Sequence, residues 1–266
     1  MRPIRILLAL VTSVVLTGCI NSTTLVKVKA DGSGTVEQTT LMNVAAMKAM
    51  IPGATASAGQ APPGFNRADL ERTATRMGKG VRLLSAEPAK NDSGFEGVKA
   101  IFEFDDINQV QVSQDPNTGN NPDRLSTEPS NADPVKFKLT RTGGTSLLTI
   151  NFTDKPAGDK PAQPGDMPDF SNPMMMGMIK SMMKGFKINI DLEVVGSIVK
   201  TNAEYVNGPR ITLLEMDLEA LLADEAKFKA LQGKIGPDAS LSEVKPYLKD
   251  IKGIKIDGPS ISVEFK

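Results

Sequence analysis

The sequence predicts an α+β domain built on a mostly antiparallel sheet of hairpins with packed helices, and three features predict it. Short runs of alternating apolar and polar residues are separated by turns rich in Gly, Asn and Asp, as in β-hairpins. Helical patterns come in separate blocks rather than alternating with single strands. Two polar, Pro-containing stretches, residues 113–134 and 154–173, bury too little apolar surface to order themselves and are expected to be mobile insertions.

The first 18 residues have the organisation of a secretory signal peptide. Arg2 and Arg5 supply a positive start, and residues 6–16 form an apolar run broken only by Thr12 and Ser13. A membrane-spanning helix needs about 20 apolar residues, and this run is near half that length. We therefore expect residues 1–18 to be removed by cleavage.

The motif at the end of this run carries a second signal. Residues 16–19, Leu-Thr-Gly-Cys, resemble the lipobox of bacterial lipoproteins. The resemblance implies cleavage between Gly18 and Cys19 by lipoprotein-processing enzymes, diacylglycerol on the Cys19 sulfur, and an acyl chain such as palmitate on the new amino group. Cys19 is the only cysteine, so no internal disulfide can form. The alternative is an ordinary signal peptide followed by an unrelated cysteine.

Lipid on Cys19 would decide the location. Two or three acyl chains hold a protein firmly on a membrane, so we expect an extracytoplasmic, lipid-anchored chain. Residues 19–23 are expected to form a short tether of about 5 residues, which at about 3.6 Å per residue keeps the domain within roughly 20 Å of the lipid. Ile20, rather than Asp, follows the cysteine, which favours the outer membrane over the inner membrane in a diderm source.

Composition excludes several classes of function. Removing residues 1–18 leaves 29 basic and 31 acidic residues, because that segment holds two basic residues and no acidic one. This charge of −2 argues against a nucleic-acid partner. The absence of histidine excludes Ser-His-Asp and Cys-His catalysis and histidine metal sites, and no nucleotide-binding motif occurs, so no cofactor is expected. With no tryptophan and two tyrosines, a sugar-binding cleft is also disfavoured.

The N-terminal half predicts two hairpins and two helices. Asp31-Gly32-Ser33-Gly34 turns the first hairpin and Asn91-Asp92-Ser93-Gly94 the second, and Asn66 is the expected N-cap of the second helix. The expected elements are a hairpin over residues 24–43, a helix over 44–51, a joint over 52–65, a helix over 66–77, and paired strands over 81–87 and 95–104.

The C-terminal half continues the pattern. The elements expected are a hairpin of residues 135–141 and 146–153, strands over 187–195, 197–201 and 210–216 with Asn207-Gly208 turning the last two, helices over 217–232 and 241–249, and a hairpin in which Ile254 and Ile256 pair with Ile261, Val263 and Phe265. Residues 24–216 form the expected main domain. Residues 217–266 are either a small C-terminal subdomain or part of the same core.

Residues 173–186 are unusually rich in methionine. On a helix, one stripe would hold Met175, Met178, Ile179, Met182 and Phe186. Methionine suits surfaces that accept varied apolar partners, so this stripe is a candidate apolar binding surface. The alternative is that the stripe packs into the core of the domain itself.

Three segments together resemble the LppM-type domain of bacterial surface lipoproteins. They are residues 29–36 (KADGSGTV), 102–108 (FEFDDIN) and 196–203 (GSIVKTNA), the last followed by Tyr205-Val206-Asn207-Gly208 and Ile211-Thr212. The resemblance implies an α+β extracytoplasmic domain with binding of membrane lipids or glycolipids rather than catalysis.

Three functions therefore stand as hypotheses. The first is a non-catalytic binding module for lipid, an amphipathic ligand or the membrane surface. The second is a structural lipoprotein that docks an envelope protein partner. The third is a carboxylate-dependent hydrolase, for which the first carboxylates to test are Asp105, Asp106, Glu215 and Asp217. Helix capping is the competing explanation for the adjacent pair Asp105 and Asp106.

Overall fold

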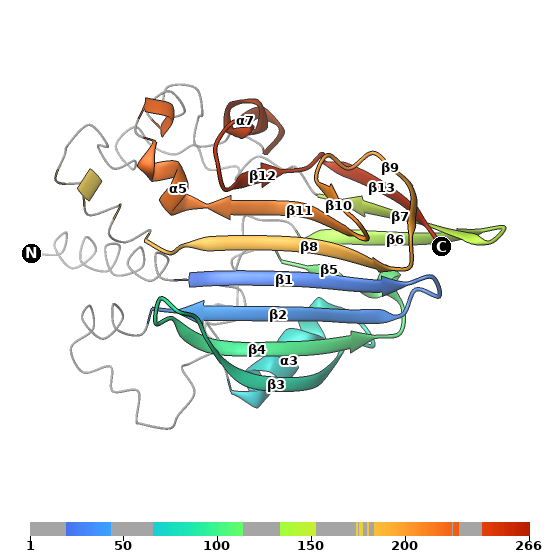
Figure 1. The fold of residues 1–266 in the computed structure, drawn as a ribbon. Helices are drawn as coiled ribbons and strands as arrows, with labels where there is room; N and C mark the ends of the chain where they lie inside the picture. The colour runs from blue at the N-terminus through green and yellow to red at the C-terminus, as the bar shows by residue number, and fades with distance from the viewer. Residues whose placement is uncertain are drawn as a thin grey trace, which may run out of the picture.

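The computed structural model confirms the α+β class, with sheet dominating over helix (Figure 1). It describes residues 20–43, 66–113, 134–152, 174, 176, 177, 180, 184–224, 226–228 and 241–266, without the side chains of residues 241–244. The expected helix at 44–51, the joint at 52–65 and the two insertions fall outside these residues, apart from flanking positions. Gly18, Cys19, Met175, Met178, Ile179 and Met182 also lie outside them.

Eight described strands form sheet A, in the order β10-β11-β8-β1-β2-β4-β3 with β12 beside β11. Every neighbouring pair is antiparallel except β1 and β8, which run parallel. The bounds are β1 Ile20–Lys29, β2 Gly34–Met42, β3 Arg82–Lys90, β4 Glu96–Phe104, β8 Lys187–Val195, β10 Val206–Asn207, β11 Arg210–Asp217 and β12 Ile254–Ile256.

Five described strands form sheet B, in the order β5-β6-β7-β13-β9, and it lies behind one half of sheet A (Figure 1). The bounds are β5 Gln111–Val112, β6 Val135–Thr142, β7 Thr145–Asn151, β9 Ile198–Thr201 and β13 Ser260–Phe265. The core lies between the sheets, where Val26 and Phe102 of sheet A and Leu148, Val263 and Phe265 of sheet B are completely buried.

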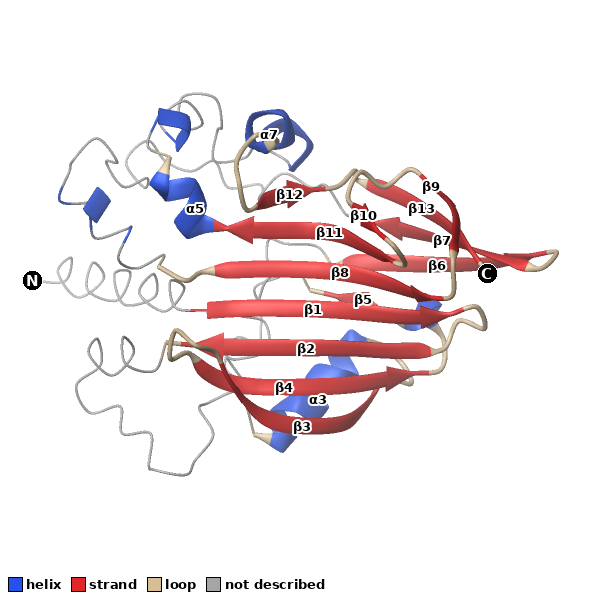
Figure 2. Cartoon of the chain, in the orientation of Figure 1, coloured by secondary structure: helices blue, strands red, loops and turns tan. Residues whose placement is uncertain are grey.

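Helix α3 (Arg67–Met77) lies behind β3 and β4, whereas α5 (Leu218–Ala223) and α7 (Leu241–Leu248) lie near the ends of β11 and β12 (Figure 2). Helix α3 begins at Asn66, whose side chain accepts the Asp69 N–H, and it places Leu70 and Met77 in the core. A short 3-10 helix (Ile107–Gln109) follows β4. Helix α5 continues directly from β11, and α7 precedes β12.

Most of the predicted hairpins are confirmed. β1 pairs with β2, β3 with β4, and β6 with β7, with the expected turns between them. The pattern of alternating apolar residues identifies these pairs because each strand packs one face on the core. Residues 217–266 contribute β12 to sheet A and β13 to the centre of sheet B, so they complete the same core as the rest of the chain.

The predicted C-terminal hairpin is wrong. β12 pairs with β11, whereas β13 pairs with β7 and β9 in the other sheet. The connection crosses from one sheet to the other, held by Asp257, whose carboxylate accepts the N–H groups of Glu204 and Gly258. In a hairpin, both apolar faces would point the same way. Crossing between the sheets lets the isoleucines of β12 and the apolar residues of β13 enter the core from opposite sides.

Two further predictions need correction. The strand over 197–201 does not pair with the strand over 210–216, because Gly196 (φ +143°) turns the chain toward sheet B, where β9 pairs with β13. A Cβ at Gly196 would lie 2.2 Å from the carbonyl oxygen of Lys266, so only glycine allows this close approach. The helix expected over 217–232 ends at Ala223, because Asp224 is not helical and instead caps a new turn by accepting the Lys227 N–H.

The correction with the largest consequence concerns the tether expected over residues 19–23. Strand β1 begins at Ile20, not at Thr24, and Ile20 pairs with Met42. The side chains of Ile20, Ser22 and Thr24 are all buried on the inner face of the sheet. Residues 20–23 therefore belong to the sheet, because hydroxyl and β-branched side chains form a strand as readily as they form a linker.

Candidate functional site

Six strands of sheet A begin or finish side by side at one end of the sheet, which we call the Ile20 end. The pairing register aligns the start of β1 with the end of β2, the start of β4 and the end of β3 on one side, and with the start of β8 and the end of β11 on the other. In order across this end of the sheet, the terminal residues of the strands are Asp217, Lys187, Ile20, Met42, Glu96 and Lys90.

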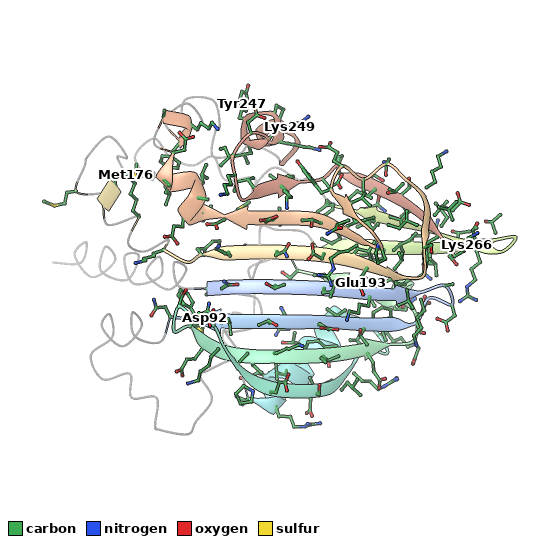
Figure 3. The ribbon with its side chains drawn as sticks, viewed as in Figure 1. Asp92, Met176, Glu193, Tyr247, Lys249 and Lys266 are labelled. Carbon is green, nitrogen blue, oxygen red and sulfur yellow. The ribbon has the colours of Figure 1, made fainter. Side chains whose placement is uncertain are left out.

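The opposite end of the strands, which we call the Asp31 end, holds the β1–β2 turn. The tip of the β6–β7 hairpin lies beside this turn, because Arg141 donates a hydrogen bond to the carbonyl oxygen of Asp31 and Ser146 donates one to that of Ala30. Lys266 lies near this end and Asp92 at the Ile20 end (Figure 3). Strand β1 has 10 residues, and at about 3.4 Å per step it separates the two ends by about 30 Å.

Loops fold across the Ile20 end. Phe95, which precedes β4, is buried, and a Cβ at Gly185, which precedes β8, would lie 2.5 Å from the Phe95 Cζ atom. β1 and β2 separate β8 from β4 by about 14 Å at about 4.8 Å per strand, so the segments that precede β4 and β8 fold toward each other across the strand ends. Gly185 has φ +75°, a conformation that favours glycine.

Helix α5 closes the other side of this end. Asp217 caps the helix by accepting the Ala220 N–H at 3.0 Å, and Glu219 accepts the Gly185 N–H at 3.0 Å. The Leu218 N–H donates to the carbonyl oxygen of Phe186 at 3.2 Å. These contacts fix the segment that enters β8 against α5.

The charged side chains of the terminal residues at the Ile20 end form ion pairs. Lys187 lies 2.7 Å from an Asp217 carboxylate oxygen, and Lys90 lies 2.7 Å from a Glu96 carboxylate oxygen. The hydrogen bond to Asp217 raises the pKa of Lys187 above its ordinary value. The Ile20 end therefore presents ion pairs of both signs rather than a basic surface.

The outer face of sheet A holds an unsatisfied polar pair. Asp191 is buried, and its Oδ1 atom and the Oδ1 atom of Asn189 are the buried side-chain oxygens without a hydrogen-bond partner within the part of the chain that the structure describes. Asn189 donates its Nδ2 to the other Asp191 oxygen at 3.1 Å. Both orphan atoms are acceptors, so a group bound here would be a hydrogen-bond donor.

The predicted Met-rich surface is only partly visible. Of its five stripe residues, the described one is Phe186, which is buried at the junction with α5 and offers no exposed surface. Outside the stripe, Met174 is 84% exposed. Met176 lies beyond the Ile20 end in Figure 3.

The four candidate carboxylates do not form a common site. Asp105 accepts two hydrogen bonds from Arg82, which lower the pKa of Asp105, and Asp106 caps the 3-10 helix, as the capping explanation predicted. Glu215 pairs with Lys255. Asp105 follows β4 at the Asp31 end, whereas Asp217 ends β11 at the Ile20 end.

The described residues contain neither a metal-binding cluster nor a membrane-spanning helix. No group of three or more acidic or cysteine side chains in the described ranges could hold a metal ion. No described helix has the length and apolar character to cross a membrane.

No protein-family model and no curated protein matches the sequence. Among solved structures, the chain is similar to the folded domain of the LppM protein of Mycobacterium tuberculosis, determined by NMR. The TM-score is 0.37 and the sequence identity 10%, and the superposition covers 94% of this chain and 91% of that one. At that identity it assigns no role to any residue of the Ile20 end.

Proposed function

We propose that the protein is an extracytoplasmic lipoprotein, anchored through lipid on Cys19, that acts as a non-catalytic binding module for lipid, an amphipathic ligand or the membrane surface. The observation that carries the proposal is the position of Ile20. This residue directly follows the lipobox cysteine and is 1% exposed in a central strand. Lipid on Cys19 would therefore be attached at the Ile20 end of the domain itself.

The connectivity of the chain supports the same end as the binding region. The apolar residues 44–51 follow β2, which ends there, and the Met-rich residues 173–186 precede β8, which starts there. Three segments of sequence suited to apolar contact, counting the lipidated cysteine, thus join the fold at one end of the sheet. Apolar segments next to an acyl anchor add affinity for lipid in proportion to the area that they bury.

The contacts of the candidate carboxylates support a non-catalytic role. The carboxylates that could have served a hydrolase cap helices or form ion pairs, and Asp105 and Asp217 belong to opposite ends of sheet A. Ile20 in place of Asp favours the outer membrane if the source is diderm. No cofactor and no nucleic acid belongs to the proposal.

One observation favours the alternative of a protein partner in an envelope assembly. Three valines near the Asp31 end are exposed, Val195 at 52%, Val199 at 51% and Val206 at 43%. Isolated exposed apolar residues are common on soluble proteins, so we rank this alternative second.

Native mass spectrometry tests the binding function. The mature chain carrying Cys19→Ser, purified without acyl lipid, should retain phospholipid or glycolipid from cells or bind it from added extracts. Met178→Asp/Met182→Asp should reduce the bound fraction, whereas the matched control Leu84→Asp, at a 56% exposed site on β3, should not. A mass free of lipid, unchanged by added lipid, would contradict lipid binding and favour the partner-docking alternative.

A further inference from the structure

We propose that the domain stands upright on the membrane, with the Ile20 end of sheet A against the lipid headgroups and the Asp31 end facing outward. This proposal rests on the lipidation of Cys19 proposed above. It goes further by assigning one end of the sheet to the membrane and the opposite end to the space beyond it.

The first step is the distance between lipid and fold. Consecutive Cα atoms are about 3.8 Å apart, so the Cα of Cys19 lies within about 4 Å of the first residue of β1. The headgroup layer on each side of a bilayer is about 5–8 Å thick, so acyl chains on Cys19 reach hydrocarbon only if the Ile20 end touches that layer.

The second step is the rigidity of the attachment. β1 is an inner strand, paired with β2 from Ile20 to Val28 and with β8 from Asn21 to Lys29. Ile20 is almost completely buried, so releasing it as a tether would break sheet pairing and expose apolar surface. The anchor is therefore continuous with the sheet.

The third step is the limit on tilt. β1 lies near the middle of the Ile20 end, about 10 Å from β11 and about 14 Å from β3 at about 4.8 Å per strand. A tilt of about 45° in the plane of the sheet would push the β3 corner down by about 10 Å, beyond the headgroup layer. That corner carries the Lys90–Glu96 ion pair, and the other carries Lys187–Asp217. Charged groups enter hydrocarbon at high cost, so the ion pairs oppose tilting in the plane of the sheet, most strongly at the β3 corner, which lies farther from β1.

The proposed orientation places each exposed turn of the domain at a defined height above the membrane. The β3–β4 turn, with exposed Asp92, would lie at the headgroups, together with Lys184. The tip of the β6–β7 hairpin, with exposed Thr142, would lie about 30 Å farther out, as the length of β1 requires. A partner in solution would meet the Asp31 end first.

Depth-dependent quenching on the lipidated protein tests the orientation. Cys19 is the only cysteine, and the thioether would consume its thiol, so Asp92→Cys and Thr142→Cys each provide a unique labelling site. Each variant is labelled with a fluorophore and reconstituted in phosphatidylcholine vesicles that contain lipid with a nitroxide on the headgroup. We expect quenching at position 92 to exceed that at position 142 at least several-fold. If Asp92→Cys does not fold, Ser93→Cys in the same turn replaces it.

A tether insertion supplies the matched control. About ten Gly and Ser residues inserted between Cys19 and Ile20 have an end-to-end distance of about 17 Å, so quenching at position 92 should fall toward that at position 142. Equal quenching at both positions without the insertion would overturn the upright orientation, as would no quenching at either. Intact mass lacking diacylglycerol would overturn the lipidation of Cys19, and the orientation with it.

Discussion

Replacing Ile20 with alanine measures whether the residue that directly follows Cys19 belongs to the core. The change removes three carbons from a side chain that is 1% exposed. At about 0.8 kcal/mol per buried CH₂ the loss is about 2.4 kcal/mol, and a residual cavity adds to it. Because Ile20 is the first residue of its strand and its surroundings can relax, we expect a loss near the lower end of the range of about 2–5 kcal/mol.

Urea unfolding of the mature chain carrying Cys19→Ser, followed by circular dichroism, measures this loss. Ile20→Val, which removes one carbon, should cost about 0.5–1.5 kcal/mol, and the two values should rank by lost volume. Thr23→Ala, on the outer face of the same strand, is the matched control and should change stability by less than Ile20→Ala. If Ile20→Ala stays within about 0.5 kcal/mol of the parent, as surface substitutions do, residue 20 lies in a flexible tether and the reasoning about the upright domain fails.

Three further measurements test the local structure. Asp217→Ala should lose about 1 kcal/mol in urea unfolding, because it removes the N-cap of α5 and the partner of Lys187, while Asp92→Ala, in an exposed turn, should change little; equal effects would contradict the cap. Gly97→Ala should cost more than about 2 kcal/mol, because a Cβ there would lie 2.0 Å from the Thr40 carbonyl oxygen, whereas Gly258→Ala, whose nearest atom is at 3.8 Å, should be nearly neutral; a stable Gly97→Ala variant would refute that close approach. Burial raises the pKa of Asp257 above 3.8, so the folded state holds this proton more tightly than the unfolded state, and its contribution to stability is present below pH 3.8 and is lost as pH rises through the raised pKa; a carboxyl NMR titration of Asp257 at or below 3.8 would contradict the burial.

The strand pairs that were predictable are those closed by local turns. Gly94 and Gly144 stand at positive φ in turns flanked by alternating apolar residues, so sequence neighbours pair with each other. The wrong predictions of strand pairing all concern partners distant in sequence. Nothing near Ile254 indicates that its neighbour is Met216, and nothing near Ile198 indicates Phe265, because these pairings follow from the closure of the whole core.

The candidate site shows the same division. The Asp217 cap is a local pattern, because an aspartate directly before an apolar helical run is a typical N-cap. The lipobox is also a local pattern and stays a prediction, because Cys19 lies outside the described residues. The contact between Phe95 and Gly185 joins loops about ninety positions apart, and its only sequence signal is a glycine followed by an aromatic residue before a strand. A single sequence does not indicate that two such loops meet over the ends of β1 and β2.

The misassigned tether shows why polar character alone does not identify a linker. Residues 21–24, Asn-Ser-Thr-Thr, look like a linker because they lack apolar side chains. In the sheet, Ser22 pairs with Thr40 and both are buried, so hydroxyl groups occupy the inner positions that Val26 and Val28 occupy farther along the same strand. None of these hydroxyls is among the unsatisfied buried groups, so the strand can begin with polar residues without leaving a hydrogen bond unmade. A linker of about 5 residues would allow separations up to roughly 20 Å, whereas a strand that starts at Ile20 allows none. A linker of that reach would have left the orientation of the domain open, whereas a strand that starts at Ile20 ties the position of Cys19 to the Ile20 end.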